Sequence, residues 1–207
     1  MTMPMTGSGK PRLAGRPRVV ERDEALQRAK DLFWSLGYQR ASLPELERAT
    51  GLQRGSLYAL FSDKRELFLE ALDLYGREGL ATMDATMPAG ARRADILAWI
   101  RVHAARAHGP AGVRGCFLVE TTVEMGPHDP VIAERAAAIF AAMLKRLERA
   151  LAGAGDAQVP DPEAAARTLL AGLEGLRVFG KAGQSEDEVA RAVGVLAATL
   201  VPPKPAS

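Results

Sequence analysis

The chain has 207 residues, of which 47% are hydrophobic and 25% charged, with a formal net charge of +2. This composition suits one compact unit, or a small domain joined to a larger core. The longest apolar runs, such as 136–144, fall well short of the roughly 20 residues that a membrane span needs. The first ten residues lack the apolar segment of a secretory signal, and one cysteine excludes an intrachain disulfide. We therefore expect a cytoplasmic protein without a membrane partner.

The positive charge is concentrated near the N-terminus. Residues 1–65 hold 12 Lys and Arg against 7 Asp and Glu, whereas the remainder holds 15 against 18. Residues 1–18 form a Pro/Gly-rich basic arm without helical periodicity, and we expect this arm to be flexible. It can follow DNA phosphates or enter a minor groove, or it can remain a solvated tail. Arg16 and Arg18, beside the first helix, are the candidates for DNA contact.

Residues 19–65 have the pattern of a helix-turn-helix domain. Apolar residues at helical spacing predict a supporting helix over 20–36, which Gly37 ends. Ser42 and Glu45 form a capping box that begins a second helix, and Gly51 supplies the turn after it. A third helix runs from about 54 to 60. Two short helices joined by a tight turn are typical of DNA-reading domains.

The third helix and the start of the fourth carry the predicted DNA contacts. Gln53, Arg54 and Ser56 lie on its exposed face, and short polar side chains with one arginine suit a major groove. We expect Ser62 to cap the fourth helix. Lys64 in the first turn opposes the helix dipole unless an anion is near, and a DNA phosphate would be that anion.

The string G-x-x-x-G-S-L-Y-x-x-F-x-x-K resembles the DNA-binding signature of the TetR family of bacterial transcriptional regulators. Gly51, Gly55, Leu57, Tyr58, Phe61 and Lys64 carry this resemblance, which covers roughly the first third of the chain. It implies a double-stranded DNA operator, with Tyr58 and Lys64 on phosphates. The candidate DNA-binding residues are Arg16, Arg18, Ser42, Leu43, Gln53, Arg54, Gly55, Ser56, Tyr58 and Lys64.

The sequence departs from the common family pattern at four positions. Glu47 and Thr50 stand where alanine is usual, Gln53 where serine is usual, and Leu60 where histidine or tyrosine is usual. Gln53 is also a poor helix cap. These differences concern the operator sequence and the detailed contacts.

The rest of the chain reads as helices only, which predicts an all-α, nine-helix TetR-like architecture. A connecting helix spans 66–86, and the break at 86–90 separates it from an effector-binding and dimerisation domain at 87–202. The tail is 203–207. Asp129-Pro130 and Asp161-Pro162 mark the starts of the seventh and eighth helices, since proline is tolerated in a first helical turn.

The resemblance implies a small-molecule effector bound inside the helical domain. Candidate pocket residues are Trp99, His103, Cys116, Phe117, Thr121, Met125, Phe140, Met143 and Phe179. Soft and aromatic walls suit an apolar ligand, although the same spacing also fits ordinary core packing. The last two helices are rich in small residues and are expected to form a homodimer interface. Its candidate residues are Leu169, Leu173, Leu176, Val193, Leu196 and Leu200, for which packing within one chain is the alternative.

The leading hypothesis is a homodimeric repressor that a small apolar effector releases from a palindromic operator. Cys116 offers an alternative, because a helix start near Arg114 can lower a thiol pKa and create a sensor of oxidants, electrophiles or copper; an inert buried thiol is the other interpretation. An all-α enzyme is a further alternative, but no Ser/His/Asp set, metal motif or paired-carboxylate spacing appears, although Glu120 and Glu124 share a helix face at i, i+4. No cofactor or metal is expected, because no His or Cys pair has strong ligand spacing.

Overall fold

The structure, a computed structural model, describes residues 18–205, without the side chains of 18–21, 110 and 111. Ten helices and no strand lie in this part of the chain. They are α1 (Arg18–Arg40), α2 (Leu43–Thr50), α3 (Arg54–Phe61), α4 (Lys64–Thr86), α5 (Arg93–Ala105), α6 (Gly109–Arg114), α7 (Phe117–Met125), α8 (Pro130–Gly153), α9 (Pro162–Lys181) and α10 (Glu186–Leu200). The nine expected helices are present, and the structure adds the short α6.

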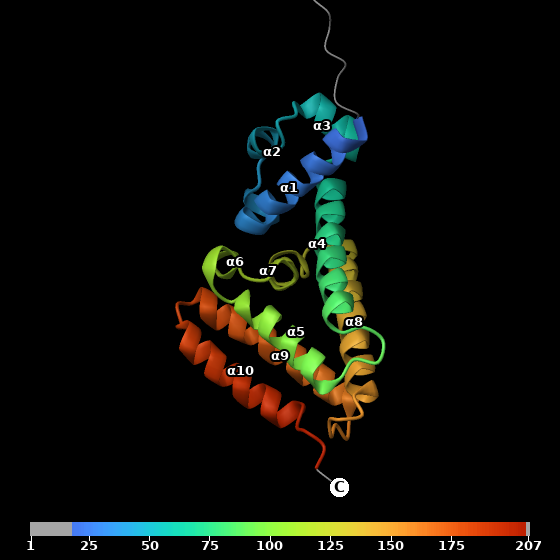
Figure 1. Ribbon diagram of the computed structural model, residues 1–207. Helices are drawn as coiled ribbons and strands as arrows, with labels where there is room; N and C mark the ends of the chain where they lie inside the picture. The colour runs from blue at the N-terminus through green and yellow to red at the C-terminus, as the bar shows by residue number, and fades with distance from the viewer. Residues whose placement is uncertain (1–17, 206–207) are drawn as a thin grey trace, which may run out of the picture.

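Figure 1 shows two groups of helices joined by α4. The first, here called the reader, comprises α1 to α3. The second, the body, comprises α5 to α10, with α8 running beside α4 and with α5, α9 and α10 stacked at the far end. Helices α6 and α7 lie between α1 and this stack. Each group has buried side chains of its own, such as Phe33 and Leu57 in the reader and Trp99 and Leu147 in the body.

The predicted capping box at the start of α2 is present, and α3 is capped by a residue other than Gln53. The backbone N–H of Ser42 donates to the Glu45 carboxylate at 2.8 Å, and Gly51 has the left-handed φ of 73° that the turn requires. Gln53 makes no side-chain cap at the start of α3 with any described residue. Instead, the Glu47 carboxylate accepts the Arg54 N–H at 2.6 Å. Gln53 removes the usual cap of α3, and Glu47, also a departure from the family pattern, supplies another.

The expected cap of α4 was wrong by one residue. Ser62 ends α3 with a φ of 62°, whereas Asp63 is extended and its carboxylate accepts the Glu66 N–H at 2.9 Å. Serine and aspartate are both good caps, so the backbone conformation decides between them. Asp129 and Asp161 cap α8 and α9 as predicted.

Candidate functional site

The candidate DNA-reading face is the outer surface of α3 and the residues beside it. Leu57 and Phe61 are buried and anchor the helix, so its opposite side faces solvent. Five candidate residues are exposed, namely Ser42, Gln53, Arg54, Gly55 and Ser56, while Leu43, Tyr58 and Lys64 are half-buried. Arg16 lies outside the described residues, and Arg18 begins α1 without a described side chain. The face is thus polar, and Arg54 is the exposed arginine of α3.

The two cations of this face lie against aromatic rings. The Arg54 guanidinium is 5.8 Å from the Tyr58 ring centroid, and the Lys64 ammonium is 4.5 Å from that of Tyr38. Partial burial lowers the pKa of Lys64, against the raising effect of the Glu124 and Glu45 carboxylates. These rings orient both cations without neutralising them, because a cation–π contact leaves the charge intact.

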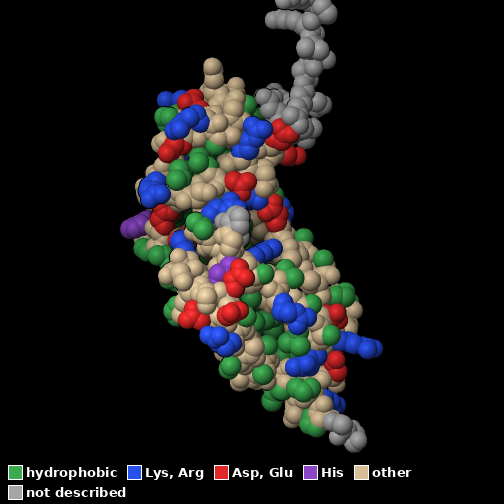
Figure 2. Space-filling model, turned by 60° about the vertical axis from the view of Figure 1, so that its left-hand side comes forward, with side chains coloured by type: hydrophobic (Ala, Val, Ile, Leu, Met, Phe, Trp, Pro, Cys, Tyr) green, Lys and Arg blue, Asp and Glu red, His purple; other side chains and the backbone are tan. Residues whose placement is uncertain are grey.

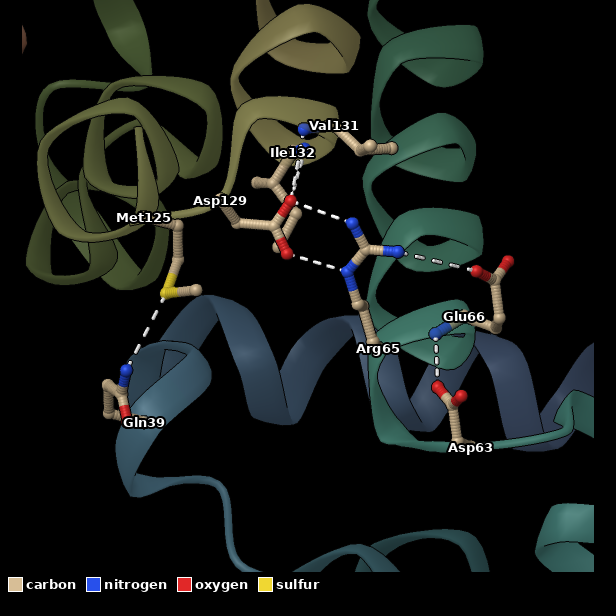
Figure 3. Close-up of polar contacts among 8 residues, drawn as sticks. All are labelled: Gln39, Asp63, Arg65, Glu66, Met125, Asp129, Val131 and Ile132. Carbon is tan, nitrogen blue, oxygen red and sulfur yellow. Dashed lines mark hydrogen bonds and ion pairs between the residues drawn. The ribbon is translucent and has the colours of Figure 1, made fainter. Parts of the chain in front are cut away.

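The reader contacts the body through α7, and the connecting helix α4 contacts the start of α8. Glu124 accepts the backbone N–H groups of Tyr38 and Gln39, each at 2.9 Å. These two amides point at one carboxylate because Gly37, with φ at 79°, breaks α1 just before them. At the other docking point, the Arg65 guanidinium binds the Asp129 carboxylate at 2.6 and 2.8 Å (Figure 3).

A third contact joins α1 to the segment between α6 and α7. The indole N–H of Trp34 donates to the Gly115 carbonyl at 3.0 Å, and the Arg114 guanidinium stacks 3.9 Å from the Trp34 ring. Arg114 also binds Asp31 at 3.1 Å. None of these contacts was predicted, since they join residues about 80 positions apart.

The two paired carboxylates of α7 serve different contacts. Glu120 binds the Lys181 ammonium at 2.5 Å, while Glu124 holds the two α1 amides. Each carboxylate therefore has a structural partner on a different element. This arrangement gives the enzyme alternative no free acid and base pair at this position.

A small cavity lies in the body between α4, α5 and α9. Its volume is about 20 Å³, enough for roughly one water molecule. Among the candidate pocket residues, Trp99, His103, Cys116 and Met143 line it. The lining residues that sequence reasoning missed include Tyr75, Gly76, Gly79, Thr82, Met83, Glu174 and Arg177. No local signal marks them, because five separate segments contribute to the wall.

The other candidate pocket residues lie elsewhere. Phe117, Thr121 and Met125 are buried in the core outside the cavity lining, and Phe140 packs half-buried against the core. Phe179 is 52% exposed, so its expected place in the pocket is wrong. It sits on the outer face of α9, where helical spacing alone does not distinguish inside from outside.

The cavity wall carries a buried polar cluster. His103 Nε2 lies 3.0 Å from Glu174 Oε1, and Arg177 Nη2 donates to the Gly115 carbonyl at 2.8 Å. Arg177 Nη1 lies 3.5 Å from Glu174 Oε2. Among the described residues, Glu174 Oε2 and Arg177 Nε have no hydrogen-bond partner. Tyr75 donates its hydroxyl to the Cys116 sulfur at 3.7 Å.

The pKa shifts define the charges in this cluster. Burial lowers the pKa of His103 more than Glu174 raises it, so the ring is neutral. Burial acts to raise the pKa of Glu174, but the His103 hydrogen bond and the neighbouring charges outweigh it, so its pKa is lowered. Arginine stays protonated in proteins. The cluster thus holds one negative and one positive charge.

Cys116 does not have the setting of a reactive thiolate. It is 5% exposed at the start of α7, and burial raises its pKa to about 12. Arg114, which was expected to lower this pKa, instead contacts Trp34 and Asp31. The thiol is therefore protonated at neutral pH in this conformation.

A larger and more open groove, of about 610 Å³, lies between α5 and α10. Its walls are mainly apolar, with Leu97, Ile100 and Val193 among them, and Arg101 and His108 at its edge. None of the candidate pocket residues lines this groove. It does not include any residue of α4 or of the reader.

Half of the candidate dimer residues point into the protomer. Leu169, Leu173 and Val193 are buried within the single chain, so an intermolecular role for them is wrong. The partly buried Leu176, Leu196 and Leu200 pack against the same core. The exposed large apolar side chains of these helices are Val178, Phe179 and Val195. Figure 2 shows hydrophobic side chains at the surface of the body, mixed with Lys and Arg.

The described part of the chain offers neither a membrane segment nor a metal cluster. None of its helices combines the length and the apolar character that crossing a bilayer requires. Within residues 18–205, no group of three or more His, Cys, Asp or Glu side chains is placed to hold a metal ion.

Comparisons with known proteins agree with both halves of this architecture. The sequence profile of bacterial regulatory proteins of the tetR family matches residues 25–71, and that of tetracyclin repressor-like C-terminal domains matches residues 90–196. The HTH-type transcriptional repressor ComR of Escherichia coli (strain K12) is 36% identical over 124 residues. That alignment covers 58% of this chain and 58% of ComR.

Solved structures share the fold over most of its length. A TetR transcriptional regulator from Chloroflexus aurantiacus J-10-FL has a TM-score of 0.79 at 22% identity, covering 88% of this chain and 96% of that one. The TetR family transcriptional regulator CifR, as a cysteine mutant with 26-bp operator DNA, has a TM-score of 0.70 at 30% identity. That match covers 88% of this chain and 98% of CifR. The two profile matches and this likeness show that the chain belongs to the TetR family of bacterial regulatory proteins.

Proposed function

We propose that this protein is a DNA-binding transcriptional regulator that acts as a homodimeric repressor and is released by a small effector. The observation that carries the proposal is the course of α4. This helix begins with Lys64 at the candidate DNA-reading face and, farther along, lines the body cavity through residues from Tyr75 to Met83. ComR, a named transcriptional repressor, and CifR, solved on operator DNA, support the DNA-binding part.

The small size of the cavity gives a mechanism for release. A volume of about 20 Å³ excludes any organic effector from this conformation. An effector therefore binds only a conformation in which α4 has moved away from α5 and α9. Ligand binding shifts the population toward that state. A preference of about 3 kcal/mol for it would change operator occupancy roughly a hundredfold.

We place the dimer contact on the outer face of α9. Exposed or half-exposed residues recur there at helical spacing, and most are small, which lets two helices approach closely. They are Ala164, Thr168, Ala171, Gly175, Val178 and Phe179. A twofold pair positions two recognition helices on half-sites about 34–36 Å apart. This face replaces the inward-facing Leu169 and Leu173 of the sequence prediction.

Gel retention of the DNA upstream of this protein's gene tests the DNA-binding proposal. Arg54→Ala is expected to relax sequence discrimination, by about 1–3 kcal/mol if Arg54 makes a bidentate base contact. Lys64→Ala is expected to weaken binding to all DNA and to reduce the salt slope by about one. Arg149→Ala, at an exposed arginine of α8, is the control for charge removal. Sequence-blind losses of equal size from Arg54→Ala and Lys64→Ala would contradict base reading by Arg54.

Sedimentation tests the dimer face. Phe179→Glu is expected to yield monomers, because it buries a charge within the proposed contact. Val123→Glu places the same charge at an exposed position of α7 and is expected to leave the assembly unchanged. A Phe179→Glu protein that still sediments as a dimer would place the interface elsewhere.

A further inference from the structure

We propose that the effector is an uncharged small molecule with a group that both donates and accepts hydrogen bonds, such as a phenol, alcohol or primary amide. That group would lie between Glu174 Oε2 and Arg177 Nε. The inference rests on the proposed function, since it names the chemistry of the molecule that would open the α4 cavity. It replaces the purely apolar effector of the sequence prediction.

The first argument is the pair of unsatisfied atoms. Glu174 and Arg177 are one helical turn apart on α9 and at least nine-tenths buried, and both line the cavity. Glu174 Oε2 and Arg177 Nε have no hydrogen bond in the described structure, although Oε2 lies 3.5 Å from Arg177 Nη1 as an ion pair. Buried polar groups in native proteins are nearly always satisfied. The first of these atoms is an acceptor and the second a donor, so a ligand that satisfies both must itself donate and accept.

The second argument is the charge balance. The negative charge of Glu174 and the positive charge of Arg177 already compensate, while His103 is neutral and Cys116 is protonated. A carboxylate or an ammonium group would add an uncompensated charge to a buried site, and burying an unpaired charge is strongly unfavourable. The site therefore selects a neutral ligand over anionic and cationic molecules of the same shape.

The third argument concerns the walls and the entrance. Trp99, Met83 and Met143 supply apolar and adaptable surface around the polar pair. Gly79 of α4 and the partly exposed Val102 of α5 lie at the cavity edge. A Cβ at Gly79 would meet no described atom within 4 Å, so space exists there. A ring or a short apolar chain fits this wall once α4 moves.

The groove between α5 and α10 lacks the same signal. Among the described residues, the buried side-chain atoms without a partner belong to Thr121, Glu174 and Arg177, and none of these residues lines the groove. The groove also has no contact with α4, which carries the reader. Of these two sites, the α4 cavity alone has both buried polar atoms without a partner and a wall formed by α4, the helix that leads to the reader.

The test uses four single-ring probes of similar shape with the full chain. Calorimetry would compare benzyl alcohol, toluene, benzoate and benzylamine. We expect benzyl alcohol to bind at least 10-fold more tightly than each of the other three. Equal or tighter binding of toluene, benzoate or benzylamine, or no binding of any probe, would overturn the inference.

Charge-changing variants make the test sharper. Glu174→Gln leaves Arg177 without its counter-charge, so it is expected to lose affinity for benzyl alcohol and to prefer benzoate. Glu163→Gln makes the same change in the exposed pair with Arg167 on the same helix, and is expected to keep the wild-type order. If Glu174→Gln does not fold, Gly79→Phe at the partly exposed cavity edge serves instead and should abolish benzyl alcohol binding. Unchanged probe selectivity in a folded Glu174→Gln protein, or unchanged binding in Gly79→Phe, would count against the site.

Gel retention with the same probes separates this inference from the proposed function. Benzyl alcohol that binds with the expected selectivity but leaves the operator complex intact would support the site and contradict effector release through it. Failure of the probe series overturns the site, whatever happens to the DNA complex.

Discussion

Trp34 in the reader and Arg177 in the body donate hydrogen bonds to the same carbonyl oxygen, that of Gly115, at 3.0 and 2.8 Å. Arg177 lines the body cavity, and Trp34 lies on α1, which packs against α2 of the reader. One backbone atom thus connects the cavity wall to the reader. A change at Arg177 on effector binding would act on Gly115 and, through it, on the position of α1.

Trp34→Phe is expected to lower the free energy of unfolding by about 0.5–1.5 kcal/mol, the usual contribution of one hydrogen bond. The phenyl ring keeps much of the aromatic contact with Tyr75, whose ring centroid lies 5.1 Å away. Urea unfolding of Trp34→Phe, Arg114→Gln and the double variant would measure their coupling. Because Arg114 stacks on Trp34, the double variant should lose less than the sum of the two single losses. Additive losses would show that the Arg114–Trp34 contact contributes nothing measurable to stability.

Gly37→Ala is expected to be more destabilising than Gly90→Ala, although both glycines have nearly the same φ, 79° and 77°. A positive φ strains any residue other than glycine, and Gly37, with ψ at 175°, lies in a region that is essentially glycine-only, at a cost of about 1–3 kcal/mol. Only at Gly37 would the new Cβ also lie 2.6 Å from a Glu124 carboxylate oxygen. At Gly90, it would meet no described atom within 4 Å. Thermal unfolding of both variants measures the difference; equal losses would mean that Glu124 moves aside without cost.

The Arg65–Asp129 pair makes stability depend on pH in the acid range. Hydrogen bonding to Arg65 holds the pKa of Asp129 at about 2, whereas an unfolded aspartate titrates near ~3.9. Because the folded pKa is the lower one, the stabilisation is present above about pH 4 and is lost as the pH falls toward 2. Asp129→Asn, which can still cap α8, should therefore melt below wild type at pH 7.

The difference in melting temperature between Asp129→Asn and wild type should shrink between pH 4 and pH 2.5. Asp161→Asn is the control, because Asp161 caps α9 and has no ion pair with any described residue. At pH 7, the melting temperature of Asp161→Asn should differ less from wild type than that of Asp129→Asn does. A melting-temperature difference between Asp129→Asn and wild type that stays constant down to pH 2.5 would contradict a charge-based role for Asp129.

Cys116 is expected to react slowly with iodoacetamide in the folded protein. With a pKa of about 12, the thiolate fraction at pH 8 is only about one in ten thousand. The labelling rate should still rise about tenfold per pH unit up to pH 9, and protein unfolded in guanidinium should label far faster. Labelling of the folded protein at the rate of the unfolded one would instead support the hypothesis that Cys116 is a reactive sensor thiol.

Local sequence signals predicted most of the helix starts and the turn of the reader. The capping box at Ser42, the turn at Gly51 and the Asp-Pro starts at Asp129 and Asp161 act within four residues of their own position. Such interactions form wherever the chain carries them, and the structure has them all. The cap of α4 was misplaced because Ser62 and Asp63 are adjacent and equally capable, and their choice depends on how α3 ends.

Only the tertiary structure decided which side of each helix is covered. A stripe of leucines on α9 predicts an apolar face but not the surface that meets it, so Leu169 and Leu173 were assigned outward although the protomer buries them. Phe179 was assigned inward for the same reason. The polar cluster is the extreme case, because Tyr75, His103, Cys116 and Glu174 come from segments up to about 100 residues apart. Side chains with no periodic relation become neighbours only when packed helices bring them together, and that long-range packing has no local signature in the sequence.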